Sequence, residues 1–316
     1  MRPAASTIRR HRTIGLGAAL VAGLTLLVGC ASAPTGGSAG PSGDTRQPTV
    51  ITALYPLAYT AQSVAGAKAN VSSLTTGGVE PHDLELDPQQ VASLREADLV
   101  VYIPGLMPTL DEAVSGLRSD QVLDATSVVT LRGAPNPDPH LWLDPTALAR
   151  VGTAIADRLT ELSPASAEAY AAGSRDFAAR MTDLDRAWRL GTTTCDRREI
   201  FVTHDAFGYL TDRYDLRGIS ILGRSPEQEP SAARLAEIAD QMTKVGATTV
   251  FAEPAIGGAP TNPIAQTVAT ANGSQVATLD PLEIEPAQGD YATAMLANLD
   301  AVQQALGCAP APQATS

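Results

Sequence analysis

The chain has 316 residues, enough for one large or two ordinary domains, and its 44% hydrophobic content can fill a sizeable core. Acidic residues number 34 against 22 basic ones, and the formal net charge of −12 argues against a basic nucleic-acid-binding face. Three cysteines are too few for a disulfide-rich scaffold or a cysteine-rich zinc ribbon. The composition therefore indicates an acidic globular protein with no nucleic-acid partner.

The first 29 residues have the layout of a secretory signal peptide. Four arginines without an acidic neighbour precede an apolar stretch, residues 14–29, that is short for a permanent membrane span. Residues 27–30, Leu-Val-Gly-Cys, resemble a bacterial lipobox, in which Cys30 becomes lipidated after cleavage. An ordinary signal peptide with a chance cysteine is the alternative. Residues 30–47, rich in Ser, Gly, Pro and Thr, are expected to form a flexible tether. We therefore expect an extracytoplasmic protein that is lipid-anchored to the cell membrane.

Residues 48–160 alternate short apolar runs with amphipathic stretches. Strands are predicted at residues 49–54, 71–74, 99–103 and 121–123. Helices are predicted at residues 59–67, 88–96, 110–117 and 145–162. Strands that alternate with helices favour a parallel sheet with right-handed crossovers, so this segment is interpreted as an amino-terminal α/β lobe.

A long helix is predicted next, after Ser163 and Pro164, which have the character of an N-cap and a first helical residue. Residues 165–190 contain no proline, a single glycine at position 173, and apolar residues at helical spacing. About 26 helical residues would span roughly 40 Å. Residues 161–191 are therefore interpreted as a helix that links two lobes. Two helices broken near Gly173 are the alternative.

The alternation resumes in residues 192–316. Strands are predicted at residues 200–203, 218–222, 248–252 and 275–279. Helices are predicted at residues 206–214, 231–244, 262–271 and 290–306. The fold class is therefore expected to be α/β, with a second lobe of the same type as the first.

Outside the signal peptide the sequence has three histidines, and each lies at a turn or after a predicted strand. They occur in Glu-Pro-His-Asp at His82, Asp-Pro-His-Leu-Trp-Leu-Asp-Pro at His140 and Thr-His-Asp-Ala-Phe at His204. Asp280 follows the last predicted strand in the same way. Ligands of open α/β sheets bind at the carboxyl ends of strands, and three imidazoles with one carboxylate suit a divalent transition-metal ion. For each histidine taken singly, a surface or hydrogen-bonded role is the alternative.

Three acidic residues lie close to the histidines in the sequence. Asp83, Asp144 and Asp205 are candidates to accept a hydrogen bond from the outer ring nitrogen of a metal-binding imidazole. No short metal motif such as His-Glu-x-x-His is present. The spacing of the histidines therefore predicts the kind of site without naming a family.

Four motifs together resemble those of a known protein family. The residues around His82, the segment 139–145, the segment 204–210 and Leu-Asp-Pro-Leu at 279–282 resemble, in this order, the metal-binding solute receptors of zinc and manganese ABC importers. That family includes lipoproteins once described as adhesins. The resemblance extends over residues 48–308. It implies two (β/α)4-type lobes joined by one long rigid helix, with the metal in the cleft between the lobes. It also implies a monomeric binding protein, not an enzyme, that works with an ABC permease and its ATPase.

By the same resemblance, His82 and His140 are the expected metal ligands of the amino-terminal lobe, and His204 and Asp280 those of the carboxyl-terminal lobe. Manganese receptors of the family tend to have a carboxylate at the third position, so His204 favours Zn²⁺, with Mn²⁺ as the alternative. Two features are departures. Many zinc receptors of the family carry a long loop rich in histidine and acids near the cleft, which this sequence lacks, and Glu283 replaces the glycine that usually follows Asp-Pro-Leu.

Two further features of the second half have more than one interpretation. Cys195 and Cys308 are expected to form a disulfide outside the cytoplasm, with free thiols as the alternative. Glu253 follows a predicted strand and is expected to pair with Arg224, to support a loop of the cleft, or to be an ordinary surface acid.

Three rival functions stay open at this point. The first is a manganese or iron receptor on the same scaffold. The second is a metallohydrolase that uses the three histidines as its metal site and Asp205 or Asp280 as a base. The third is a surface adhesin whose metal is structural.

Overall fold

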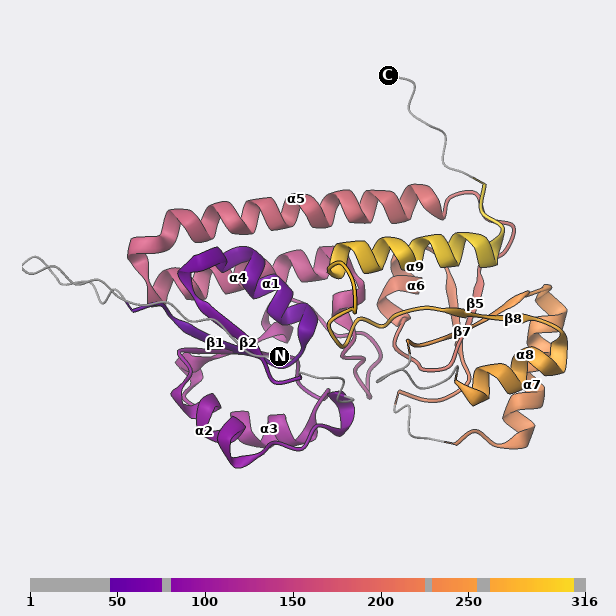
Figure 1. Ribbon diagram of the computed structural model, residues 1–316, viewed down its shortest axis with the longest axis horizontal. Helices are drawn as coiled ribbons and strands as arrows, with labels where there is room; N and C mark the ends of the chain where they lie inside the picture. The colour runs from indigo at the N-terminus through magenta and orange to yellow at the C-terminus, as the bar shows by residue number, and fades with distance from the viewer. Residues whose placement is uncertain (1–45, 76–80, 225–228, 255–261, 310–316) are drawn as a thin grey trace, which may run out of the picture. The chain divides into compact units, whose positions relative to one another are not determined.

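The structure is a computed structural model, and it describes residues 46–75, 81–224, 229–254 and 262–309 (Figure 1). The predicted signal peptide, the lipidation site Cys30 and most of the tether lie outside these residues. None of the helices within them combines the length and the apolar character that a membrane crossing requires.

The first half of the fold is a parallel sheet of four strands in the order β2-β1-β3-β4. Its strands are β1 (Thr49–Thr52), β2 (Asn70–Ser73), β3 (Leu99–Tyr102) and β4 (Val122–Asp124). The two central strands, β1 and β3, are almost entirely buried, as their runs of β-branched residues predict. Val50 in β1 pairs with Val71 on one side and with Leu99 on the other.

Four helices accompany this sheet: α1 (Tyr55–Ala65), α2 (Pro88–Glu96), α3 (Pro108–Ser115) and α4 (Pro145–Leu162). Local signals set where α2 and α4 begin. Asp87 and Gln90 form a capping box at the start of α2, and the carboxylate of Asp144 accepts a hydrogen bond from the Thr146 amide at the start of α4.

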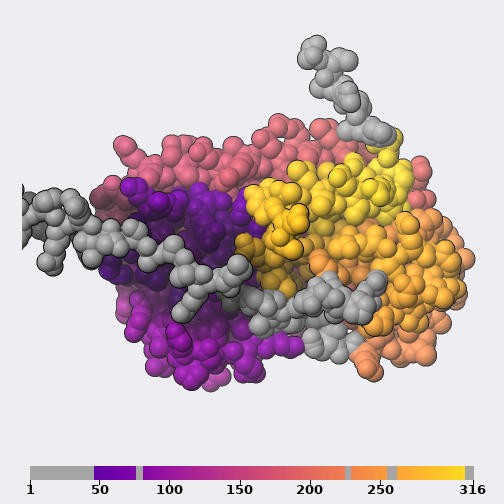
Figure 2. All heavy atoms as spheres, viewed as in Figure 1, coloured from indigo at the N-terminus to yellow at the C-terminus, as the bar shows by residue number. Residues whose placement is uncertain are grey.

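The long helix is continuous and forms α5 (Ala167–Gly191). It packs on α1 and α4 in its first part and on α9 (Tyr291–Leu306) in its second part, and α5 and α9 lie side by side in Figures 1 and 2. Gly173 does not break it. A Cβ at this position would lie 2.2 Å from the carbonyl oxygen of Val64 in α1, so glycine permits the close approach of the two helices.

The prediction that Ser163 is the N-cap of the long helix is wrong. Ser163 precedes a short 3-10 turn, Pro164–Ser166, and its side chain makes no capping hydrogen bond. Because that turn separates Ser163 from the first α-helical residue, the regular helix begins only at Ala167.

The second half repeats the architecture, with a parallel sheet in the order β6-β5-β7-β8. Its strands are β5 (Glu199–Val202), β6 (Arg217–Ser220), β7 (Thr249–Ala252) and β8 (Gln275–Thr278). Its helices, besides α9, are α6 (Gly208–Arg213), α7 (Ala232–Val245) and α8 (Pro263–Asn272). The expected fold class, two α/β halves and one long helix, is therefore confirmed.

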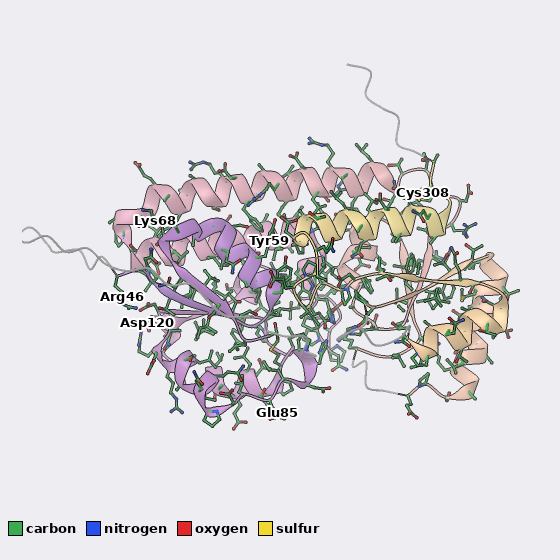
Figure 3. The ribbon with its side chains drawn as sticks, in the orientation of Figure 1. Arg46, Tyr59, Lys68, Glu85, Asp120 and Cys308 are labelled. Carbon is green, nitrogen blue, oxygen red and sulfur yellow. A yellow bond between two sulfur atoms is a disulfide. The ribbon has the colours of Figure 1, made fainter. Side chains whose placement is uncertain are left out.

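Two hydrophobic clusters hold these elements together. The larger cluster extends from the first sheet through α4, α5 and α9 to the second sheet, and Trp142, Trp188 and Tyr291 are among its fully buried members. The smaller cluster lies between the second sheet and helices α7 and α8. A Cys195–Cys308 disulfide, as expected, connects the segment after α5 to the end of α9, and Figure 3 marks the position of Cys308.

Candidate metal centre

The structure brings all three histidines together with one carboxylate, and that carboxylate belongs to Glu283. One donor atom from each of His82, His140, His204 and Glu283 lies within 4.8 Å of the other three. The side chains of His140, His204 and Glu283 are at most 3% exposed, and that of His82 is 14% exposed. Such a group of nitrogen and oxygen donors has the composition of a site for a transition-metal ion.

The four donors lie in connections that follow strands of both sheets. His82 lies in a 3-10 turn, Pro81–Asp83, in the connection that follows β2, and His140 lies in the connection between β4 and α4. His204 is the second residue after β5, and Glu283 lies in the loop after β8. The carboxyl ends of parallel strands meet at one edge of a sheet, and this geometry collects residues that are far apart in the sequence.

The donor atoms are close enough for one ion to bridge them. The Oε1 atom of Glu283 lies 3.2 Å from Nε2 of His140 and 3.6 Å from Nε2 of His82. Tetrahedral zinc with bonds of about 2.0–2.1 Å separates its ligand atoms by about 3.3 Å. Nε2 of His140, Nδ1 of His204 and Oε1 of Glu283 are buried and make no hydrogen bond of good geometry within the described residues. Buried polar atoms in this state require a partner, and a bound cation would supply it.

Hydrogen bonds orient two of the imidazoles. Nδ1 of His140 lies 2.7 Å from Oδ1 of Asp138, which leaves Nε2 to face the centre. Nε2 of His204 lies 2.8 Å from the carbonyl oxygen of Arg224, so Nε2 carries the hydrogen and Nδ1 faces the centre. Each imidazole is thereby fixed in the tautomer that presents a lone pair to a metal.

Asp138 holds His140 in place of the three acids that the sequence suggested. Asp144 caps α4 and lies 3.1 Å from Nε of Arg213, and Asp205 lies 3.9 Å from Nε of Arg224. Asp83 is exposed. Sequence reasoning missed Asp138, and the available signal was its position two residues before the histidine, across a proline.

Asp280 lies outside the group of four and shapes the turn that presents Glu283. Its Oδ1 accepts a hydrogen bond of 2.7 Å from the Leu282 amide, and its backbone amide and carbonyl both bond to the side chain of Asn298. Leu282 has φ of 60°, in the left-handed region. A residue with a side chain rarely adopts this conformation unless its surroundings hold it there, and here Leu282 is fully buried and its amide is bonded to Asp280. Glu283 was visible in the sequence only as a departure from the family pattern.

Burial and neighbouring charges shift the pKa values of the site in opposite directions. Burial by itself lowers the pKa of His140, but the hydrogen bond to Asp138 and the adjacent carboxylate of Glu283 outweigh burial and raise this pKa to about 9. Burial also lowers the pKa of His204, and the carboxylate of Glu253 outweighs it, so the net shift is upward. Burial raises the pKa of Glu283, but the neighbouring imidazoles of His140 and His82 hold that pKa well below its usual range. Burial and the neighbouring Glu253 and Glu283 raise the pKa of Asp280 to about 6, although the Leu282 amide lowers it.

Direct hydrogen bonds fasten the ligand loops of the two halves to each other. The indole nitrogen of Trp142, two residues after His140, donates to the carbonyl oxygen of Pro281, two residues before Glu283, at 2.7 Å. The hydroxyl of Tyr291 donates to the carbonyl oxygen of Trp142. The donors of both sheets are therefore held by buried contacts as well as by their own strands.

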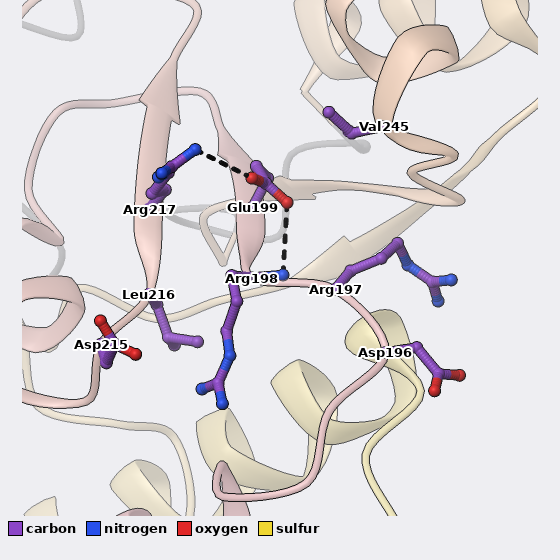
Figure 4. A pocket seen from close by; sticks show the side chains of 8 residues that line it. All are labelled: Asp196, Arg197, Arg198, Glu199, Asp215, Leu216, Arg217 and Val245. Carbon is purple, nitrogen blue, oxygen red and sulfur yellow. Dashed lines mark hydrogen bonds and ion pairs between the residues drawn. The ribbon is translucent and has the colours of Figure 1, made fainter.

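Another cavity, of about 360 Å³, lies at the opposite edge of the second sheet (Figure 4). It is lined at the amino ends of β5 and β6 by arginines and acids, and Glu199 bonds to Arg217 and to the backbone amide of Arg198. Its lining has as many positive as negative side chains, namely Arg197, Arg198 and Arg217 against Asp196, Glu199 and Asp215. This cavity lacks the histidine donors of the metal centre.

Comparisons with known proteins agree with this geometry. The high-affinity zinc uptake system protein ZnuA of Bacillus subtilis is 28% identical over 305 residues, which cover 89% of this chain and 94% of that protein. The zinc-binding lipoprotein AdcA of Streptococcus pneumoniae is 29% identical over 284 residues and 81% of this chain, which spans only 55% of AdcA. The crystal structure of the Zn(II)-bound ZnuA-like domain of pneumococcal AdcA matches with a TM-score of 0.72 and 28% identity, and covers 83% of this chain and 99% of that domain.

The family model of the zinc-uptake complex component A, periplasmic, matches residues 50–305. This range contains both sheets, the long helix and all four donors of the metal centre. The chain belongs to the ZnuA family of periplasmic components of zinc-uptake complexes.

Proposed function

We propose that this protein is an extracytoplasmic receptor that binds Zn²⁺ and delivers it to an ABC permease. The observation that carries the proposal is the buried cluster of three imidazoles and one carboxylate, with His82, His140, His204 and Glu283 as the ligands. In this assignment Glu283 takes the place that the sequence suggested for Asp280. The relatives that are named for zinc uptake and zinc binding support the same metal.

The donor set favours zinc over manganese. Three nitrogen atoms and one oxygen suit the tetrahedral geometry of Zn²⁺, whereas Mn²⁺ prefers oxygen ligands in a larger coordination shell. For a site built from nitrogen donors, affinity also rises from Mn²⁺ towards Zn²⁺. The site is therefore assigned to Zn²⁺, and the relative affinities of the two metals test this assignment.

The same shell favours binding over catalysis. A catalytic zinc site keeps one coordination position open for water, whereas four protein donors fill a tetrahedral shell. The metal is accordingly the cargo of the protein.

Delivery requires that the receptor stay close to the membrane. A lipid on Cys30 and the tether of residues 30–47 would hold the folded part at the outer surface of the membrane. We infer that it acts there as a monomer, with a permease and its ATPase as partners. The buried contacts that join the two halves favour metal release through movements of the ligand loops instead of a wide hinge rotation.

Calorimetric titration of the metal-stripped protein with Zn²⁺ and Mn²⁺ tests the proposal. We expect one tight Zn²⁺ site and much weaker Mn²⁺ binding. Glu283→Gln should weaken zinc binding strongly, while Glu285→Gln, an exposed carboxylate two residues away, should not. Asp280→Asn keeps an oxygen that can accept from the Leu282 amide, so its effect should be smaller than that of Glu283→Gln.

Two results would contradict this assignment. If Asp280→Asn abolished binding while Glu283→Gln did not, Asp280 would be the ligand. If Mn²⁺ bound more tightly than Zn²⁺, the protein would be a manganese receptor.

A further inference from the structure

A second carboxylate, that of Glu253, lies against the metal centre without belonging to the group of four. Oε1 of Glu253 is 2.9 Å from Nδ1 of His204, which is the ring nitrogen that faces the centre. Both atoms are buried, and neither makes a hydrogen bond of good geometry within the described residues. The Glu253 carboxylate therefore lies against the ring nitrogen that His204 turns towards the other donors.

The position of Glu253 differs from that of the ligands in two ways. Among the described residues, the group whose donor atoms all lie within 4.8 Å of one another contains the three histidines and Glu283. Glu253 is not a member of this group. The Glu253 side chain is also 21% exposed, against 1% for His204 and 3% for Glu283. One carboxylate oxygen of Glu253 thus touches His204 while another part of the side chain reaches solvent.

Its backbone fixes this position. Glu253 is the first residue after β7, a strand that is buried along its whole length and pairs with β5, the strand that leads to His204. The backbone amide of Thr203 donates to the carbonyl oxygen of Phe251, so the two strand ends are joined next to the site. Glu253 is consequently held beside His204 by the sheet.

We propose that Glu253 is an entry and exit ligand, which binds the incoming hydrated Zn²⁺ together with Nδ1 of His204 and then passes it to the four buried ligands. The inference rests on the proposed zinc-binding function. Each step exchanges a bound water or the Glu253 oxygen for one buried donor, any proton on Nδ1 leaves to water, and zinc keeps its oxidation state. Release follows the same steps in reverse.

The physical reason is the burial of the final site. Zn²⁺ arrives with its water shell, and the buried donors accept it only after most of that water has left. A carboxylate at the boundary replaces water during this partly dehydrated stage and so lowers the barrier. Because the barrier is common to entry and exit, both rates should rise together, and the affinity should change little.

Stopped-flow measurements of zinc loading, and of zinc release to a chelator, test the proposal on the full metal-stripped chain. For Glu253→Gln we expect both rates to fall about tenfold while the dissociation constant stays within about threefold, unlike the 10- to 100-fold affinity loss typical of residues that orient a ligand. Glu253→Asp should restore part of both rates. Glu285→Gln, which also removes one negative charge but is exposed outside the cluster, should leave both rates unchanged.

The outcomes separate the possibilities. Unchanged rates in Glu253→Gln would refute the proposal. A faster release with an unchanged loading rate would make Glu253 a positioning residue or a permanent ligand, and would also refute it. If Glu285→Gln slowed loading and release as much as Glu253→Gln, the slowing would reflect only long-range attraction of the cation, and the proposal would be refuted. Such an attraction should disappear at high salt. Failure of the unaltered protein to bind zinc would overturn the proposed function itself, which is a distinct result.

Discussion

Replacement of Asp138 by asparagine should weaken zinc binding although Asp138 lies outside the group of four donors. The Asp138 carboxylate is 1% exposed and accepts hydrogen bonds from Nδ1 of His140 at 2.7 Å and from its backbone amide at 3.1 Å. Its second oxygen lies 3.1 Å from Nη1 of Arg132. Asparagine has nearly the same shape, so Asp138→Asn mainly removes the charge that makes His140 a strong donor.

Two opposing effects set the magnitude. Loss of such a carboxylate partner typically lowers metal affinity about 10- to 100-fold, or about 1.4 to 2.8 kcal/mol. The carboxylate also helps to raise the pKa of metal-free His140 to about 9, and at pH 7 the proton that it stabilises opposes zinc binding by about 2 to 3 kcal/mol. Asp138→Asn lowers that pKa and relieves the competition. The affinity loss should therefore be small near pH 7 and approach its full size near pH 9.

Competition titrations against a chelator of known zinc affinity, at pH 7 and pH 9, measure both effects. Asp212→Asn is the matched control, because Asp212 also pairs with Arg132, at 2.8 Å, but lies 63% exposed and away from His140. This control should leave zinc affinity unchanged and cost less than about 1 kcal/mol of stability. If Asp138→Asn bound zinc as tightly as the unaltered protein at pH 9, Asp138 would not be the residue that prepares His140.

Three other predictions concern stability. A pKa of about 9 for His140 in the folded metal-free protein, against about 6.5 when unfolded, gives stabilisation that is complete below about pH 6.5 and is lost as the pH rises to 9. Urea unfolding without metal should show this decline, and a free energy of unfolding that rises over this range would contradict it. Gly173→Ala places a Cβ 2.2 Å from a backbone oxygen of α1 and should cost about 1 to 3 kcal/mol or more, whereas Gly116→Ala, with its nearest neighbour at 3.6 Å, should be nearly neutral in thermal unfolding. Reduction of Cys195–Cys308, which closes 113 residues, should lower the free energy of unfolding by about 3 to 5 kcal/mol, and equal denaturant midpoints with and without reductant would refute this.

Most predicted elements have bounds within two residues of those in the structure, but the first helix, predicted at residues 59–67, begins four residues earlier, at Tyr55. Helices α2 and α4 have the predicted bounds, because an aspartate cap and a proline at the first helical position are local signals. The buried strands were visible as apolar, β-branched runs. The histidines were recognisable as candidate donors because their positions after strands follow from the parallel α/β pattern.

Contacts between segments decided the rest. The continuity of α5 through Gly173 depends on the approach of α1, which is distant in sequence. That Glu283, and not Asp280, lies among the four clustered donors depends on a turn in which Leu282 adopts a left-handed conformation and Asn298 holds the backbone of Asp280. Asp280 and Glu283 both follow β8, and the periodicity of a strand does not predict which of two loop residues points towards the other donors.

The partners of the imidazoles were undecidable for the same reason. Asp138 is adjacent in the sequence to a proline and two residues from His140, yet it is no closer along the chain than Asp83 is to His82 or Asp205 to His204. Only the folded loop shows that Asp138 reaches a ring nitrogen and that Glu253, 49 positions away from His204 in the numbering, does so too. Spacing along a strand or helix predicts which face a side chain occupies, whereas the meeting of two loops depends on how the packed sheets and helices place their ends.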